Sequence, residues 1–147
     1  MNLLKVVLIG LVLLAYSCTS QSNNESTDDS NLHHEYSHLD VELNKGKRWE
    51  ANTETTEGIE NMISLVNNSK VDADLSEYHQ LAKELEIEFT TIFKKCTMKG
   101  EAHNQLHNYL IPLKNSIEGL KAEKAEVCQK NYKQIKKHLA AYNRFFN

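Results

Sequence analysis

The sequence predicts an all-α protein, an up-down-up-down four-helix bundle that is preceded by a signal peptide and a flexible tether. Three observations lead to this prediction. Apolar residues recur at alternating spacings of three and four through most of residues 48–147, which is the pattern of a buried helix face. The 147 residues include only five glycines and one proline, and no alternating apolar run between turn residues indicates a sheet. The short connections between the helical patterns favour antiparallel neighbours.

The first 17 residues have the pattern of a bacterial lipoprotein signal peptide. Lys5 is the only charged residue before the apolar run 6–15, and this run is shorter than the roughly 20 residues that a membrane-spanning helix needs. The run leads into LLAYSC, which ends at Cys18 and resembles the lipobox. The resemblance implies cleavage before Cys18, diacylation of its thiol and acylation of the new amino terminus. An ordinary secretion signal with an incidental cysteine is the alternative.

The lipid anchor makes the membrane the first expected partner. Two or more acyl chains anchor a protein stably, so no transmembrane helix is required. Thr19, rather than an aspartate, follows Cys18, and by resemblance to the common sorting rule this indicates the outer membrane, on its periplasmic or surface face. No basic stripe is present, which argues against nucleic acid as a partner. An envelope protein remains a second class of partner.

Residues 18–47 are expected to connect the anchor to the bundle. Residues 19–31 contain no large apolar side chain, so they cannot offset the entropy of ordering and should form a flexible tether. Residues 32–47 have a mixed pattern and indicate a partly ordered lead-in. The bundle is therefore assigned to residues 48–147.

Each of the four predicted helices is recognised by a row of apolar positions. The first follows the potential helix caps Asn52 and Thr53 and has the row Ile59, Met62, Ile63 and Val66. The second starts near Asp74 and has the row Leu75, Tyr78, Ala82, Leu85, Phe89, Ile92 and Cys96. The third has the row His103, Leu106, Leu110, Leu113, Ile117 and Leu120. The fourth has the row Ala125, Cys128, Tyr132, Ile135, Leu139, Tyr142 and Phe146.

Two further expectations follow from this arrangement. The centre of the core should contain Leu85, Phe89, Leu110, Ile117, Ile135 and Leu139. Cys96 and Cys128 should be free thiols, because they lie at opposite ends of the bundle. A helix of about 18 residues spans about 27 Å, whereas a disulfide needs Cα atoms within about 7 Å.

One short segment, CTMKGEAHNQLH, holds four potential metal ligands. His103 and His107 are four residues apart, so both project from one helix face, the spacing by which a helix presents two imidazoles to one ion. Cys96 and Met98 add sulfur donors from the preceding turn. Thiolate, thioether and imidazole together favour copper, or zinc if the methionine does not bind. The sequence therefore predicts a copper or zinc site formed by these four residues.

The same four residues also fit a purely structural role. A cysteine on an apolar row behaves as a small hydrophobic residue, and a histidine there can be hydrogen-bonded in the core. The alternative function is therefore a structural or protein-interaction lipoprotein that binds no metal and no cofactor. The sequence gives no positive evidence for an enzyme, because it contains no nucleophile–base–acid arrangement, GxSxG, HExxH or phosphate loop.

Two short motifs resemble the first and last helices of the soluble cytochrome b-type four-helix bundles. They are GIENMISL, which contains Met62, and AAYNRFFN at the C-terminal end. In that family a methionine near the start of helix one and a histidine after a tyrosine near the end of helix four ligate haem. Met62 matches the methionine, but Asn143 stands at the histidine position and cannot serve as that ligand. The resemblance therefore implies the fold and argues against haem, and the lack of CxxCH excludes covalent haem.

A second resemblance covers the segment from KRW, at residues 47–49, through CTMKGEAHNQLH. This segment is similar to small, largely uncharacterised helical lipoproteins of Bacteroidota-type bacteria. The resemblance implies a signal peptide and a helical domain, and it implies no particular activity.

Overall fold

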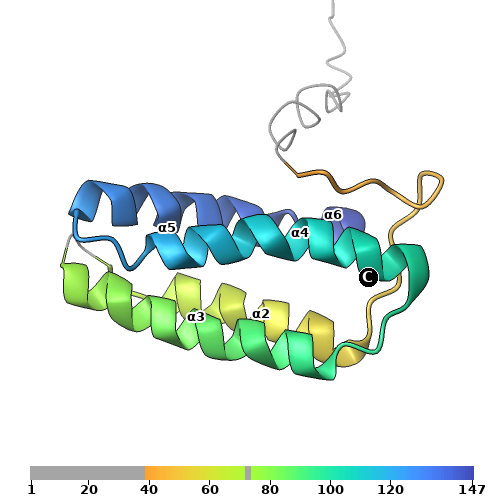
Figure 1. Ribbon diagram of the computed structural model, residues 1–147, viewed down its shortest axis with the longest axis horizontal. Coiled ribbons are helices and arrows are strands. Elements are labelled where there is room, and N and C mark those ends of the chain that lie inside the picture. Colours follow the sequence, from red (N-terminus) through yellow and green to blue (C-terminus); the bar gives the residue numbers. More distant parts are fainter. Residues whose placement is uncertain (1–38, 72–73) are drawn as a thin grey trace, which may run out of the picture.

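The structure is a computed structural model that describes residues 39–71 and 74–147. The predicted signal peptide, Cys18 and the tether up to residue 38 lie outside the described residues. The described chain forms, in order, α2 (Thr53–Asn68), α3 (Leu75–Lys95), α4 (Gly100–Gly119), α5 (Ala125–Ala140) and the short α6 (Tyr142–Phe145) (Figure 1). Two isolated bridges are the only β-type pairings in this part of the chain, so the all-α prediction is confirmed.

The four long helices pack side by side around a common core (Figure 1). Helix α2 contacts α3 and α5, and α4 also contacts both of these helices. The side chains with almost no exposed surface come from all four helices and include Ile59, Met62, Tyr78, Leu85, Ile92, Leu106, Tyr109, Leu110, Leu113, Ile117 and Ile135. The apolar rows of the sequence are therefore the faces that meet in the core.

Five of the six residues expected at the centre of the core are buried, which confirms that part of the prediction; they are Leu85, Leu110, Ile117, Ile135 and Leu139. The expectation for Phe89 was wrong, because its side chain is only half-buried. Its ring packs against the exposed ring of Phe93, one turn later in α3, with the ring centroids 4.9 Å apart. This i,i+4 aromatic pair lies at the boundary of the core, because Phe89 packs against the core while Phe93 is 44% exposed.

The ends of α2 and α3 are held by two different kinds of polar contact. Helix α3 begins next to Asp74, as predicted, and Asp74 caps it, because its carboxylate accepts a hydrogen bond from the backbone N–H of Ser76 at 2.9 Å. Asn52 precedes α2 but forms no side-chain cap. Its Nδ2 instead donates to the carbonyl of Lys95 at 3.3 Å, which satisfies one of the free carbonyls at the end of α3. This contact joins the start of α2 to the end of α3.

The fourth apolar row is divided between two helices, whereas the sequence predicted one. Helix α5 ends at Ala140, and the backbone N–H of Ala141 bonds to the carbonyl of His138 at 3.0 Å, three residues back. This tighter turn ends the regular helix before α6 begins. Tyr142 and Phe146 remain buried, with their rings stacked at 5.2 Å, so the row keeps its place in the core.

Residues 39–52, here called the strap, cross the end of the bundle before α2 begins (Figure 1). Leu39 and Val41 are buried against the helices. The backbone N–H of Glu42 donates to Gln105 Oε1 at 2.7 Å, and Asn108 Nδ2 donates to the carbonyl of Asp40 at 2.8 Å. The described part of the lead-in is therefore fastened to α4.

The second half of the strap pairs with the C-terminal residues. The backbone N–H of Trp49 donates to the carbonyl of Phe145 at 2.7 Å, and the carbonyl of Trp49 accepts from Asn147 at 3.0 Å. The backbone N–H of Ala51 donates to the carbonyl of Asn147 at 2.9 Å. These bonds form a parallel bridge that ties the strap to the end of α6.

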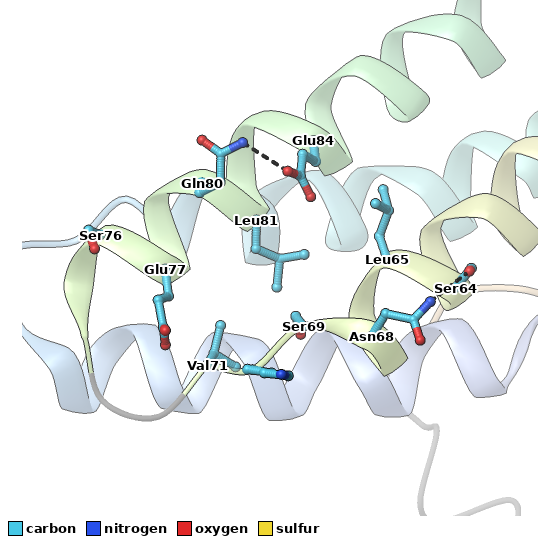
Figure 2. Close-up of a pocket in the computed structure, with 11 residues that line it drawn as sticks. Ser64, Leu65, Asn68, Ser69, Val71, Ser76, Glu77, Gln80, Leu81 and Glu84 are labelled. Carbon is cyan, nitrogen blue, oxygen red and sulfur yellow. Dashed lines mark hydrogen bonds between the residues drawn. The ribbon is translucent and has the colours of Figure 1, made fainter.

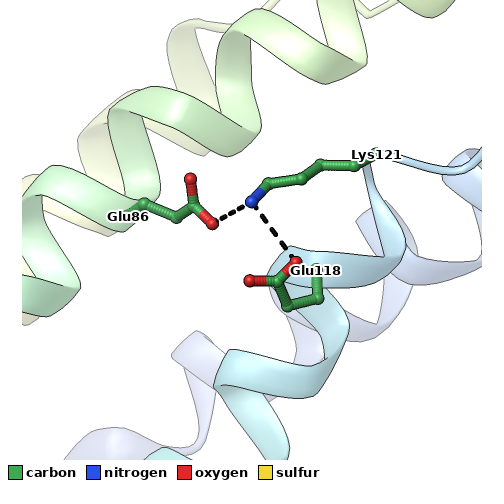
Figure 3. A network of polar contacts seen from close by, with 3 residues as sticks. All are labelled: Glu86, Glu118 and Lys121. Carbon is green, nitrogen blue, oxygen red and sulfur yellow. Dashed lines mark hydrogen bonds and ion pairs between the residues drawn. The ribbon is translucent and has the colours of Figure 1, made fainter.

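A small ion-pair network joins the opposite end of α4 to α3. Lys121 Nζ pairs with Glu86 on α3 and with Glu118 Oε2 at 3.3 Å (Figure 3). The hydrogen bond to Glu86 is the main reason that the pKa of Lys121 is raised. All three groups are substantially exposed, so the network adds little to stability. No helix in the described ranges is both long and apolar enough to cross a membrane.

Candidate metal site at one end of the bundle

The four predicted ligands lie around the turn from α3 to α4. Helix α3 ends at Lys95, and the backbone N–H of Cys96 still bonds to the carbonyl of Ile92 at 2.9 Å. The chain is then extended until Gly100 starts α4 with φ of +61°, a conformation that favours glycine. This turn places Cys96 beside the first two turns of α4, which carry both histidines.

His103 and His107 are in direct contact. Their Nε2 atoms are 3.0 Å apart, and their ring centroids are 4.5 Å apart. Both side chains are half-buried. Two nitrogens bound to one tetrahedral ion at about 2.0–2.1 Å lie about 3.3–3.4 Å from each other. A small rotation of either ring would therefore let both Nε2 atoms bind the same ion.

Cys96 contacts the other edge of the His103 ring. Its Sγ lies 3.7 Å from Nδ1 of His103, which is within hydrogen-bond distance for sulfur. Because Nδ1 and Nε2 point in different directions, the sulfur does not face the space between the two Nε2 atoms. The three side chains thus form a chain from Cys96 through His103 to His107, rather than three donors around one point.

Met98 is half-buried and packs against the hydrophobic core. It therefore takes the packing position that the structural alternative expected. Across residues 39–71 and 74–147, no group of three or more His, Cys, Asp and Glu side chains is arranged to hold a metal ion. The structure brings Cys96, His103 and His107 together, and an ion bound between the two histidines would have two protein ligands.

An aromatic side chain outside the predicted set of ligands packs against His107. The ring of Phe93 meets that of His107 edge to face, with centroids 5.4 Å apart and an interplanar angle of 89°. Phe93 lies outside the predicted apolar row of its helix. The signal that could have found it is its i,i+4 spacing from Phe89, which places both rings on one edge of α3.

Glu101, the acid of α4 nearest in sequence to the two histidines, is hydrogen-bonded to other residues. The carboxylate of Glu101 accepts hydrogen bonds from Gln105 Nε2 at 2.8 Å and from Asn104 Nδ2 at 3.2 Å. The bond from Gln105, followed by that from Asn104, lowers the pKa of Glu101 below its ordinary value. Glu101 therefore supports the face of α4 that meets the strap, through Gln105.

The residues named by the cytochrome b resemblance lie in different environments. Met62 is fully buried in the core, whereas the side chain of Asn143 is exposed. The carbonyl of Asn143 accepts a hydrogen bond from Arg48 of the strap at 3.3 Å. Asn143 thus contacts the strap through its own backbone carbonyl.

A separate pocket of about 390 Å³ lies between the end of α2 and the start of α3, at the other end of the bundle (Figure 2). It is open and has a mixed lining of hydroxyl, amide, charged and aliphatic groups. Gln80 Nε2 donates to Glu84 Oε1 at 2.8 Å, so two of its polar groups satisfy each other. The lining contains no histidine or cysteine, so the histidine pair remains the stronger candidate for a metal site.

Comparisons with known proteins provide no relative for this chain: no family model, no curated protein and no solved structure matches it.

Proposed function

We propose that this protein is a lipid-anchored component of a bacterial envelope whose up-down-up-down bundle binds a copper or zinc ion through His103 and His107. The observation that carries the metal proposal is the 3.0 Å separation of the two Nε2 atoms. The lipobox-like sequence before Cys18 supports the anchor. The short connections between α2, α3, α4 and α5, together with the contacts between consecutive helices, support the topology.

The histidine pair is suited to an ion because folding has already positioned it. Both imidazoles come from adjacent turns of one helix, so binding costs little additional conformational entropy. Neutral imidazole is a common ligand of both zinc and copper. Cys96, at Nδ1 of His103, is placed to orient that ring in the way that outer-shell hydrogen bonds orient metal-binding histidines.

Two protein ligands leave further coordination positions for water or for a group of another molecule. Structural zinc sites are closed by four protein ligands, whereas exchangeable and catalytic sites keep a position open. We therefore propose reversible binding and transfer of the ion rather than a role of the ion in folding.

A structural or protein-interaction lipoprotein is the second candidate. It is favoured by the hydrogen-bond chain itself, because Cys96, His103 and His107 satisfy one another without an ion. One imidazole Nε2–H then donates to the other Nε2. In that case the chain only holds the turn between α3 and α4.

Calorimetric titration of protein purified without an affinity tag, using Zn(II), Cu(II) and Cu(I), separates the two candidates. We expect one ion per chain and loss of binding in the double variant His103→Ala, His107→Ala. The matched control is His79→Ala, a half-buried histidine on α3 whose Nε2 lies 3.2 Å from the carbonyl of Ala122. Weak binding that is unchanged in the double variant would reject the metal site and leave the interaction role.

A further inference from the structure

The strap contains a tight turn whose backbone is unusual for its sequence. The backbone N–H groups and carbonyls of Asn44 and Lys47 bond to each other at 2.8 and 3.0 Å. Lys45 and Gly46 occupy its two central positions with φ of +52° and +83°. Among the described residues, Lys45 is the only non-glycine residue with positive φ. Asparagine or glycine would adopt this conformation more easily, so the lysine occupies this position against the backbone preference.

The chain on both sides of this turn is attached to the bundle. Before it, Leu39 and Val41 are buried, and after it Trp49 pairs with the C-terminal residues. The indole Nε1–H of Trp49 donates to the carbonyl of Glu42 at 2.5 Å and closes the base of the turn. Figure 1 shows the resulting loop projecting beyond the end of the bundle.

Residues 43–48, here called the basic turn, combine three cations with one exposed apolar side chain. Lys45, Lys47 and Arg48 are all exposed, and Leu43 is 43% exposed. In the described part of the chain, no carboxylate forms an ion pair with Lys45 or Lys47. The three acids of the strap, Asp40, Glu42 and Glu50, all lie outside the turn. The positive charge of the strap is therefore concentrated in the turn.

We propose that the basic turn docks the bundle onto the anionic headgroups of the membrane that anchors the protein. The proposal rests on the proposed lipid anchor for the choice of membrane. Cationic side chains beside an exposed leucine match an interface that is negatively charged outside and apolar beneath. The strap is the described segment nearest to Cys18 in sequence. The 20 residues between them, 19–38, reach at most about 70 Å when fully extended.

A soluble acidic partner is less consistent with the same features. The whole chain has a net charge of −3, so attraction to an anion depends on contact with the turn itself. Leu43 would add little to binding of a highly charged polymer, whereas a lipid surface offers apolar volume directly below the charges. The observations therefore favour lipid.

Vesicle co-sedimentation tests the proposal without the acyl chains. The chain from residue 18 onward with Cys18→Ser is mixed at low salt with phosphatidylcholine vesicles that contain or lack phosphatidylglycerol. We expect binding only when phosphatidylglycerol is present. Lys45→Gln, Lys47→Gln should weaken it about tenfold or more, since each cation near an anionic surface contributes about fivefold. Leu43→Ser should weaken it further.

The matched control is Lys130→Gln, Lys133→Gln, which changes the net charge equally on the exposed face of α5. Circular dichroism shows whether each variant keeps its helices. An equal loss in the control, or equal binding to both vesicle types, would overturn the proposal. Stronger binding to soluble polyglutamate than to the anionic vesicles would also overturn it and would assign the turn to an acidic partner.

Failure of the anchor itself has a separate readout. Mass spectrometry of the protein from envelope fractions reports whether Cys18 is acylated. An unmodified Cys18 with intact vesicle binding rejects the anchor and leaves the basic turn as the membrane contact. An acylated Cys18 without binding by the unacylated chain rejects the docking role of the turn.

Discussion

Tyr109 on α4 and His138 on α5 exchange hydrogen bonds across the core. His138 Nε2 donates to the carbonyl of Tyr109 at 2.8 Å, and the Tyr109 hydroxyl donates to the carbonyl of His138 at 2.9 Å. Both side chains are buried, and burial raises the pKa of Tyr109 well above its ordinary value. Tyr109 lies about one turn before Pro112, the residue of α4 that has no backbone N–H to donate.

Removal of either half of this exchange should destabilise the protein. Tyr109→Phe deletes only the hydroxyl, and the carbonyl of His138 keeps its bond from Ala141, so we expect a loss of about 1 kcal/mol. His138→Ala also leaves a cavity and should cost about 2–4 kcal/mol. Urea unfolding followed by circular dichroism measures both. Equal stability of His138→Ala and wild type would contradict this role.

The packing of α4 and α5 predicts large losses at two buried leucines. Leu110→Ala and Leu139→Ala should each lower the free energy of unfolding by about 2–5 kcal/mol, because each leaves a cavity in the core. Ile111→Ala is the control, since Ile111 adjoins Leu110 but is 53% exposed and should change stability by less than about 0.5 kcal/mol. A larger loss of stability in Ile111→Ala than in Leu110→Ala would mean that the register of α4 is wrong.

The two thiols of the described chain should differ in reactivity while the protein is folded. Both are free, as predicted. Cys96 is half-buried, whereas Cys128 is buried and its thiol donates to the carbonyls of Leu120 and Ala122, each at 3.2 Å. Burial also raises the pKa of Cys128, which disfavours the reactive thiolate.

Iodoacetamide followed by peptide mass spectrometry should therefore label Cys96 first and Cys128 only after unfolding. No reductant should be needed for either reaction. Rapid labelling of Cys128 in the native protein, at the rate of Cys96, would be inconsistent with this structure.

The cap of α3 should make a pH-dependent contribution to stability. Hydrogen bonds from Ser76, its backbone N–H first, lower the pKa of Asp74 below 3.8 in the folded state. The ionised carboxylate therefore stabilises the fold at neutral pH, and this contribution is lost as the pH falls below 3.8 through the folded-state pKa. Asp74→Ala should be less stable than wild type at pH 7, and the difference should shrink in acid. A difference that is constant between neutral pH and strong acid would exclude the charged cap.

If the proposed lipid anchor is present, wild-type protein should partition into the detergent phase when membranes are extracted. Cys18→Ser removes the sulfur that the proposal takes to be acylated, so it should release the protein or leave its signal uncleaved. Membrane fractionation with immunodetection checks both results. If Cys18→Ser sediments and partitions like wild type, the assignment of Cys18 is wrong.

Periodicity predicted the helices well because burial repeats with the turn of the helix. The row of Leu106, Leu110 and Leu113 is buried as expected, and Asp74 caps its helix. The packing of the strap was not predicted from the mixed sequence before residue 48. Its signal is the alternation of Leu39, Val41 and Leu43 with acids, which is the period of an extended segment rather than a helix.

The arrangement of the candidate site depended on details that spacing alone does not determine. The i,i+4 spacing correctly placed His103 and His107 side by side. Which edge of the His103 ring meets Cys96 is determined by side-chain rotamers and by the path of the turn through Gly100. For the same reason the sequence could not show that Met98 packs on the core.

The position of the strap determines where a mechanical load enters the protein. A pull on the chain from its N-terminal side first reaches the bonds of Asp40 and Glu42 to α4. Behind them, the parallel bridge between Trp49 and the C-terminal residues resists further movement. Force reaches the first turn of α2 only after both sets of bonds have broken. The hydrogen bonds of the strap therefore bear such a load before α2 does.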